Sequence, residues 1–393
     1  MSSEAASYLS IVNSGDLQMA RTAAWMMVVI LASAVAPVFA QTPVTPAQTL
    51  TIPSATQTQS PLVLSENDVL LNAPASGPGT RFYVGARLIV IAPYFESNPA
   101  FLTTTIRSQG LGAPPLTLRE QGEFEYDYAL SPRIELGMQT ASGLGARVRW
   151  WHFDQDAQPR TATNDAIPFG SPVIAQTIEG VSPLTSSGPQ TGLPAVNSVR
   201  FQGAPGGTDT LTFISSLRMD TWDFEATFAD LQIERWSFLL AGGARYAQVR
   251  QTYESTLEGA VPQFLFSRQT FDGVGPTIAV EARRPILFPG LAIFGEGRLA
   301  MLFGSYEHVI EGRNQGLTPA PFPIQDQVST VSRQRFLPVI EMEMGAEYAR
   351  PIGAFEYVLQ GSVVSQLWPA GNGAHGYGNM GLFGVAMNMG VRY

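Results

Sequence analysis

The C-terminal segment Gly381–Tyr393 constrains the fold of this chain more than any other part of its sequence. Side chains of a β-strand alternate between two faces. One face of this segment is wholly apolar and ends on an aromatic residue: Phe383, Val385, Met387, Met389, Val391 and Tyr393. The other face is small or polar: Gly384, Ala386, Asn388, Gly390 and Arg392. Because alternate residues of a transmembrane β-barrel face lipid, the segment is predicted to be a barrel strand.

The same alternation recurs from Arg81 onward and predicts an all-β, up-and-down antiparallel transmembrane barrel. The segment Glu123–Gln139 is interpreted as one long strand, because its phase is unbroken across Ser131 and Pro132. About ten strands are predicted, or twelve if Phe101–Ile106 and part of Val261–Ser267 also pair. The ten are 82–90, 123–139, 146–151, 222–228, 236–246, 271–283, 291–303, 336–350, 354–367 and 381–393.

The predicted connections alternate between short and long. The short ones are Thr140–Gly143, Ala229–Gln232, Arg284–Gly290 and Pro351–Gly353. The long ones are Pro93–Gln121, Asp154–Phe213, Gln251–Arg268, Gly304–Arg335 and Trp368–Met380. Short periplasmic turns and long extracellular loops are typical of outer-membrane barrels, whereas a soluble sandwich has no reason to alternate loop lengths.

Composition supports this fold class and excludes others. Charged residues make up 14% of the chain, below the usual value of about 25% for soluble domains. The net charge of -9 and the absence of basic clusters argue against nucleic acid as a partner.

The N-terminal region is predicted to be an export signal followed by a leader. Residues 1–40 are interpreted as a signal peptide, with Met19 as an alternative start, an apolar run Trp25–Val38 and a cleavage motif ending at Ala40. Residues 41–80, rich in Pro, Thr and Gln, are predicted to be a disordered periplasmic leader. Residues 81–393 are predicted to form the barrel.

Several segments resemble the Legionella major outer membrane protein family, including its planctomycete-type members. They are Glu123–Asp154, Arg218–Asp230 with Leu239–Gln248, and Phe271–Arg283. The resemblance implies a pore-forming barrel in the bacterial outer membrane and no catalytic residues. The implied partners are outer-membrane lipid, small solutes, and the barrel-assembly machinery, the last through Gly381 to Tyr393.

Charged side chains on the polar strand faces are predicted to line the lumen, since a charge facing lipid costs about 2–4 kcal/mol. They are Arg87, Glu123, Glu125, Asp127, Arg133, Glu135, Arg147, Arg149, Asp223, Glu225, Arg245, Glu281, Arg283, Glu296, Arg298, Glu341, Glu343, Glu347, Glu356 and Arg392. Twelve carboxylates against eight arginines predict a weakly cation-selective pore. The alternative is that interstrand ion pairs fill a narrow lumen.

Aromatic residues near the strand ends are predicted to form two girdles at the membrane interfaces. Those near the short turns are Phe228, Trp236, Tyr348, Tyr357 and Tyr393. Those near the long loops are Trp150, Tyr246 and Phe303.

Signals for an enzyme or a cofactor are weak, and none is predicted. The glycine pattern Gly371–Gly376 lies outside any strand-to-helix unit, so it is interpreted as a loop. His152, Asp154 and Asp156 are interpreted as a solvated strand end rather than a metal site. His308 lies close in sequence to Ser305, but the spacing does not support a hydrolase pair.

The sequence therefore predicts a porin for passive diffusion of small hydrophilic solutes. The alternatives are a structural or adhesive barrel with a plugged lumen and partner-binding loops, or, with less support, a barrel hydrolase. The strand phase leaves two registers for one predicted hairpin. Across the turn Thr140–Gly143, paired residue numbers should sum to 282 or 284, which places Glu135 opposite Arg147 or Arg149.

Overall fold

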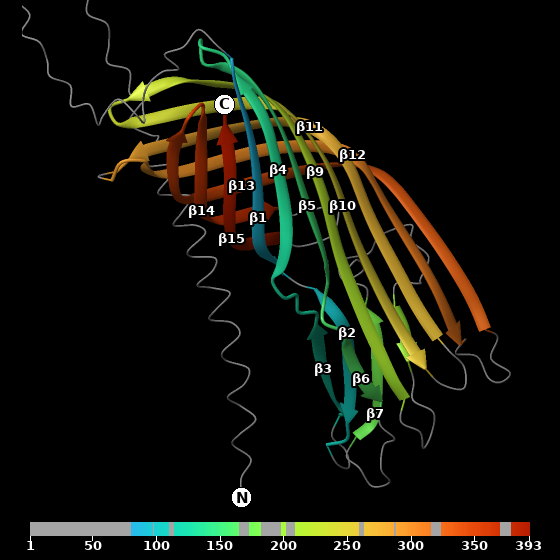
Figure 1. The fold of residues 1–393 in the computed structure, drawn as a ribbon. Coiled ribbons are helices and arrows are strands. Elements are labelled where there is room, and N and C mark those ends of the chain that lie inside the picture. The colour runs from blue at the N-terminus through green and yellow to red at the C-terminus, as the bar shows by residue number, and fades with distance from the viewer. Residues whose placement is uncertain are drawn as a thin grey trace, which may run out of the picture. The chain divides into compact units, whose positions relative to one another are not determined.

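The computed structural model describes residues 80–96, 98–109, 114–164, 173–181, 198–201, 209–258, 263–286, 288–315, 324–369 and 379–393 (Figure 1). The predicted signal peptide and, apart from Thr80, the predicted leader lie outside these residues. Among the described residues, no helix is long and apolar enough to cross a membrane.

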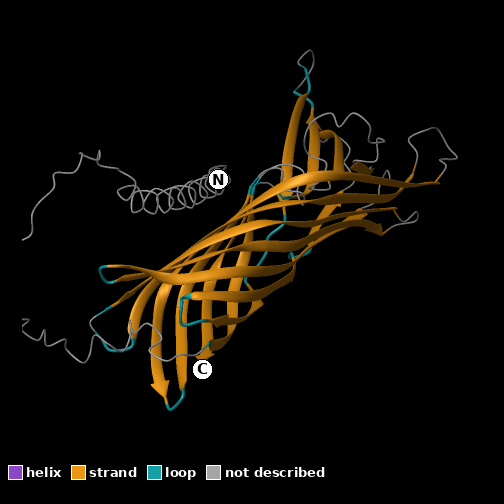
Figure 2. Cartoon of the chain, turned by 90° about the horizontal axis from the view of Figure 1, so that it is seen from above, coloured by secondary structure: helices purple, strands orange, loops and turns teal. Residues whose placement is uncertain are grey.

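Ten strands close into an antiparallel barrel, as predicted, and can be followed around it in Figure 2. The barrel order is β10-β11-β12-β13-β14-β15-β1-β4-β5-β9, and β9 pairs back with β10. Their bounds are β1 Arg81–Phe95, β4 Ala129–Gln139, β5 Leu144–Asp156, β9 Asp209–Ile233, β10 Trp236–Glu258, β11 Gln263–Pro285, β12 Leu291–Gln315, β13 Ile324–Ile352, β14 Phe355–Trp368 and β15 Met380–Arg392.

The remaining described strands lie outside this ring. β2 (Pro99–Arg107), β3 (Leu116–Glu123), β7 (Val173–Val181) and β8 (Ser198–Phe201) form a second sheet, and β6 (Arg160–Asn164) pairs with β9. The segment Phe101–Ile106 therefore does pair, but in the second sheet. Residues from Gln263 onward belong to β11, so the count of barrel strands stays at ten.

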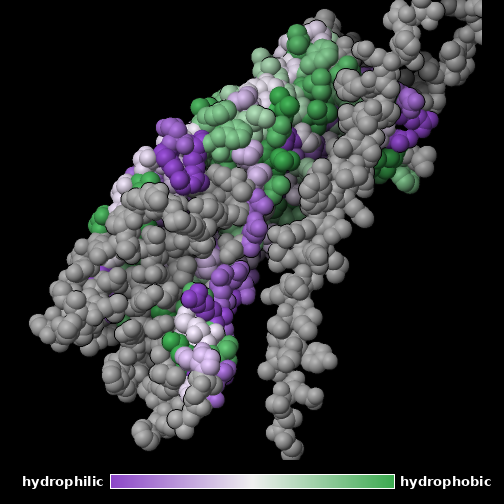
Figure 3. All heavy atoms as spheres, turned by 180° about the vertical axis from the view of Figure 1, so that it is seen from behind, coloured by the Kyte–Doolittle hydropathy of each residue, from purple (hydrophilic) through white to green (hydrophobic). Residues whose placement is uncertain are grey.

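The two faces of each barrel strand differ as the sequence alternation predicts. On β15 the outward Val385 and Met387 are 53% and 56% exposed, whereas the inward Leu382 and Ala386 are 1% and 7% exposed. In a barrel the outward face meets lipid and the inward face meets the lumen. Figure 3 shows apolar side chains gathered over the upper part of the wall in that view.

The predicted register of the β4–β5 hairpin is confirmed. Glu135 pairs with Arg149, so the paired numbers sum to 284, and Arg147 faces Gly137 instead. The turn is closed by a hydrogen bond from Gly143 N–H to the Thr140 carbonyl at 3.0 Å. Gly143 has a φ of 79°, a left-handed conformation that favours glycine.

The predicted turn Ala229–Gln232 is wrong by a few residues. β9 continues to Ile233, and the chain turns only at Glu234, whose φ is 56°. Phe238 pairs with Leu231, but Leu240 pairs with Phe228, so β9 carries an extra residue in a β-bulge. A β-bulge interrupts the alternation of apolar and polar residues as a turn does. The sequence pattern therefore suggested a turn at Ala229–Gln232 where the strand in fact continues.

The interpretation of Glu123–Gln139 as one strand is also wrong. Glu123 ends β3, β4 begins at Ala129, and the residues between them belong to no strand. Phe124 packs edge-on against Tyr253 at 5.9 Å between ring centroids, and the Tyr126 hydroxyl lies 2.9 Å from Ser215 Oγ. At Phe124 and Tyr126, the apolar face that suggested lipid contact therefore packs against protein.

Strands β9 to β13 are much longer than membrane crossing requires. A tilted spanning strand needs about 9–11 residues, whereas β10 has 23 and β13 has 29. The predicted long connections Gln251–Arg268 and Gly304–Arg335 are therefore mostly strand. Many of their inward residues are apolar, among them Tyr253, Leu257, Leu265 and Ile310, whereas Glu254, Arg268 and Glu307 face outward, a pattern opposite to that of the membrane section. This inversion made the extensions resemble loops.

The second sheet packs against the inward face of these extensions. Tyr253 of β10 donates a hydrogen bond to the Ala100 carbonyl of β2 at 2.8 Å. The Phe101 and Phe213 rings stack at 5.1 Å between centroids. A cluster of buried apolar residues results, which we term the upper cluster: Ala100, Phe124, Ala157, Ile178, Leu211, Phe213, Tyr253, Leu257, Leu265 and Ile310.

Candidate pore lumen

All ten barrel strands send charged side chains into the membrane-spanning part of the lumen, where they form a set of ion pairs in two groups, which Gln360 joins by hydrogen bonds to Arg87 and Glu347. We term this set the charged layer. Its members are Arg87, Arg133, Glu135, Arg147, Arg149, Asp223, Glu225, Arg245, Glu281, Arg283, Glu296, Arg298, Glu341, Glu343, Glu347, Glu356 and Arg392.

The centre of the charged layer is built on Arg245 and Arg298. Arg245 Nε lies 2.6 Å from Asp223 Oδ1, and its Nη1 lies 2.7 Å from Glu341 Oε1. The Arg298 side chain is 0% exposed and contacts Glu225, Glu296 at 3.0 Å, Asp223 at 3.6 Å and Glu341 at 3.5 Å. Each guanidinium thus bridges carboxylates from different strands.

Two arginines of β5 continue the network around the wall. Arg147 contacts Glu281 and lies 2.8 Å from Glu225. Arg149 lies 3.0 Å from its hairpin partner Glu135 and 2.7 Å from Glu296 across the lumen. Burial of such charges is tolerated only when they are paired, and these pairs join strands that are distant in sequence.

The charged layer extends to both ends of the membrane section. At the short-turn end, Arg392 lies 3.1 Å from Glu356 and 3.6 Å from Glu347. Toward the opposite end, Arg87 contacts Glu343, and Arg133 lies 3.7 Å from the same carboxylate.

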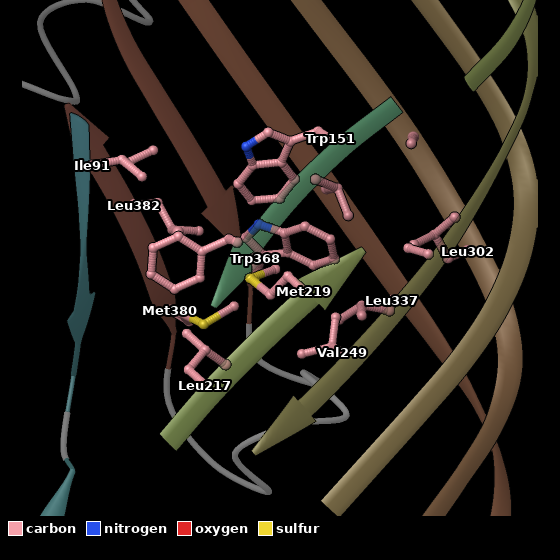
Figure 4. Packing of buried hydrophobic residues seen from close by; sticks show 14 of the residues in the cluster. Ile91, Trp151, Leu217, Met219, Val249, Leu302, Leu337, Trp368, Met380 and Leu382 are labelled. Atoms are coloured by element: carbon pink, nitrogen blue, oxygen red, sulfur yellow. The ribbon is translucent and has the colours of Figure 1, made fainter. Parts of the chain in front are cut away.

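An apolar layer lies directly beyond the charged layer, on the side of the long loops. Arg133 pairs in register with Trp151, one of its largest members. Figure 4 shows Trp151 and Trp368 reaching into the interior together with Met219, Met380 and Leu382. The layer consists of Ile89, Ile91, Trp151, Phe153, Leu217, Met219, Ala247, Val249, Phe271, Ala300, Leu302, Leu337, Val339, Val364, Trp368, Met380, Leu382 and Ala386.

Three of the predicted lumen residues lie elsewhere. Glu123, Glu125 and Asp127 are exposed residues outside the barrel strands, and Glu125 contacts Arg160. The reason is the misassigned strand before Ala129. Without them the charged layer contains nine carboxylates and eight arginines, so the predicted excess of four negative charges falls to one.

The aromatic residues near the strand ends face outward. Tyr246, Phe303, Tyr348, Tyr357 and Tyr393 are between 39% and 64% exposed, and Trp150, Phe228 and Trp236 are half-buried. Sequence reasoning left out Trp222 and Phe336, whose rings lie 6.1 Å from Trp150 and 5.1 Å from Phe303. Trp222 and Phe336 extend the aromatic girdle on the long-loop side.

The histidines do not gather into a catalytic arrangement among the described residues. His152 Nδ1 lies 2.7 Å from Asp220 Oδ1 on the outer wall. His308 faces inward and its Nε2 lies 3.0 Å from Ser267 Oγ, whereas Ser305 is on the opposite face of β12. The pattern Gly371–Gly376 lies outside the described residues.

The apolar layer is the part of the lumen that sequence reasoning missed. Trp151 shares the inward phase of Arg147 and Arg149, so its position in the lumen was readable from the sequence. Trp368 was placed in a loop, but it ends β14 and is 1% exposed.

A family model described as Legionella pneumophila major outer membrane protein precursor matches residues 78–357. No curated protein matches the sequence. Among solved structures, the outer membrane protease OmpT from Escherichia coli is 9% identical with a TM-score of 0.36, over 80% of this chain and 96% of that chain. A Pseudomonas aeruginosa FadL homologue is 6% identical with a TM-score of 0.22, over 82% and 93%. Such scores carry no inference about function.

Proposed function

Because the chain belongs to the Legionella pneumophila major outer membrane protein family, we propose that this outer-membrane β-barrel is a narrow diffusion pore for small hydrophilic solutes. The observation that carries the proposal is the charged layer, to which every barrel strand contributes. Ion pairs are not needed to fill a barrel, since replacing buried ion pairs by well-packed apolar residues is often neutral or stabilising. A charged interior is, however, what a path for water and ions requires.

In the proposed pore, the apolar layer determines the width of the lumen and whether the lumen is open or closed. Trp151, Phe153, Phe271 and Trp368 are each at most 1% exposed, so the lumen is closed at this level in the conformation described. Hydrophobic constrictions gate channels by excluding water. We therefore propose that the pore has a low conductance and that the apolar layer acts as its gate.

A structural barrel with a filled lumen is the second candidate. The burial of the apolar layer favours it, as does strand number, because barrels of about eight strands are filled by side chains and open channels have 16 or more. In that case the second sheet and the extended strands would carry the function by presenting a surface for partners.

Conductance separates the two candidates. In planar bilayers, the double variant Trp151→Ala and Trp368→Ala is expected to conduct several-fold more than the wild-type protein, because it removes the two largest side chains of the apolar layer. The matched control, Trp222→Ala and Trp236→Ala, removes two outward indoles and should leave conductance unchanged. No conductance from either the wild-type protein or the first variant would reject the pore and support the structural barrel.

Ion selectivity of the proposed pore should be weak, because nine carboxylates face eight arginines in the charged layer. A slight cation preference is expected, stronger in dilute salt, where the Debye length exceeds its value of about 10 Å at 0.1 M. Replacing both Glu341 and Glu343 by Gln leaves seven carboxylates and should shift the preference to anions. Reversal potentials under a KCl gradient measure this, and an anion preference in the wild-type protein would contradict it.

Assembly of the barrel is proposed to depend on β15. This strand closes the ring between β14 and β1, and its residues Gly381–Tyr393 are the proposed contact for the barrel-assembly machinery. The proposed pore needs no cofactor, metal or catalytic residue.

A further inference from the structure

The outer wall above the girdle on the long-loop side has a regular arrangement of side chains in cross-strand rows. The lowest row is aromatic and contains Trp150, Trp222 and Tyr246. The row above it holds His152, Asp220, Gln248 and Asp272, whose side chains bond within the row. All of these residues lie outside the lumen, so a site built on this wall can exist whether or not the lumen conducts.

Three arginines occupy the next two rows. Asp154 of β5, Arg218 of β9 and Arg250 of β10 are direct neighbours in the first of them. Arg268 of β11 lies in the second, beside Thr252. The exposed faces of β5, β9, β10 and β11 thus line a half-open cavity of about 290 Å³ that also contacts Ser216 and Asp156.

The charges in this cavity are incompletely balanced. Arg218 is paired with Asp154. Among the described residues, no carboxylate lies within ion-pair distance of Arg250 or Arg268, and Arg250 Nε is buried without a hydrogen-bond partner. Arg218 and Arg250 stand directly opposite each other, an arrangement of like charges that destabilises a sheet unless an anion lies between them.

The height of the cavity fits a lipid headgroup. Four residues separate Trp150 from Asp154, about 14 Å along a strand at roughly 3.4 Å per residue. With a tilt of about 45°, the row of Arg218 and Arg250 lies about 10 Å above the aromatic row, and the row of Arg268, two positions farther along, lies about 14 Å above it. Interfacial aromatic residues mark the headgroup level, and arginine side chains reach several ångströms toward it. Short turns of such barrels are periplasmic, which places these rows at the outer leaflet.

We propose that Arg250 and Arg268, with Arg218, bind the phosphate of a phosphorylated lipid in the outer leaflet. Guanidinium groups pair with phosphate through two parallel hydrogen bonds. The hydroxyls of Ser216 and Thr252 are hydrogen-bonded to each other, which leaves one O–H group as a further donor. Asp154 and Asp156 lie at the β5 side of the cavity and limit the anion to the β9–β11 side. The outward apolar residues below the aromatic row contact the acyl chains of the same lipid.

Native mass spectrometry of the full chain tests this site with phosphatidic acid as the probe. Phosphatidylcholine with the same acyl chains is the lipid control. Replacing Arg250 and Arg268 by Gln should weaken phosphatidic acid retention by about tenfold or more and leave phosphatidylcholine retention unchanged. The matched control is Arg107→Gln with Arg119→Gln, which removes two exposed arginines of the second sheet and should change neither.

Two results would overturn the proposal. One is equal retention of phosphatidic acid by the wild-type protein and by the Arg250 and Arg268 variant, provided heat-modifiable migration shows both are folded. The other is displacement of the lipid by inorganic phosphate at equal concentration, which would mark a site for free anions. Since both variants leave every lumen residue intact, conductance of the Arg250 and Arg268 variant should equal that of the wild-type protein.

Discussion

Val385→Arg is expected to impair folding of the protein into a bilayer. Val385 is 53% exposed on the outward face of β15, near the middle of the strand. An arginine there faces lipid at a cost of about 2–4 kcal/mol at the bilayer midplane. This is a large part of the stability of a typical domain, which is about 5–15 kcal/mol. Heat-modifiable migration after refolding into vesicles measures the folded fraction.

Asn388→Arg on the same strand is the matched control. Asn388 faces inward and its side chain donates a hydrogen bond to Gln360 at 2.6 Å. An arginine at this position enters the charged layer, where carboxylates outnumber arginines, so most of the protein should still fold. Equal loss of folding for both variants would contradict the assignment of faces.

Arg298→Met is expected to lower the free energy of unfolding by about 3–5 kcal/mol. The substitution preserves much of the side-chain volume but leaves Glu225 and Asp223 without one of their cationic partners in a buried site. Removing one partner of a buried ion pair typically costs this much, because the remaining charge is uncompensated. Urea unfolding in vesicles gives the change.

Arg160→Met is the control for Arg298→Met. Arg160 is 35% exposed and pairs with Glu125, which is 69% exposed, so its loss should cost about 1 kcal/mol or less. If Arg298→Met costs no more than this control, water solvates the centre of the charged layer, and the ion pairs of Arg298 do not behave as buried ones.

Strand number, faces and hairpin register were predictable because lipid imposes a simple rule on alternate residues. The rule limited the partner of Glu135 in the β4–β5 hairpin to Arg147 or Arg149, and the structure has Arg149. It failed where the chain leaves the membrane. In the segment before Ala129 and in the extensions of β9 to β13, the apolar face packs on protein rather than lipid, and alternation does not distinguish the two environments.

The lumen was only half predictable. Charge identifies its polar members, since a charged side chain cannot remain in lipid. A tryptophan gives no such signal by itself, because aromatic residues occur on either face of a strand, and only the phase of Arg147 and Arg149 places Trp151 inward. Trp151 and Trp368 come together only after the barrel closes, through strands that are distant in sequence. Which part of the interior is dry is therefore a tertiary property.

The unequal strand lengths give the barrel a high side and a low side. β10 and β13 have 23 and 29 residues, whereas β4 and β15 have 11 and 13. At about 3.3 Å per residue, ten or more extra residues carry the high side roughly 20–30 Å farther outward, even when tilted. Antibodies, phages and other large particles at the cell surface would meet β9 to β13 first. The low side around β15, β1 and β4 would be accessible mainly to neighbours within the membrane.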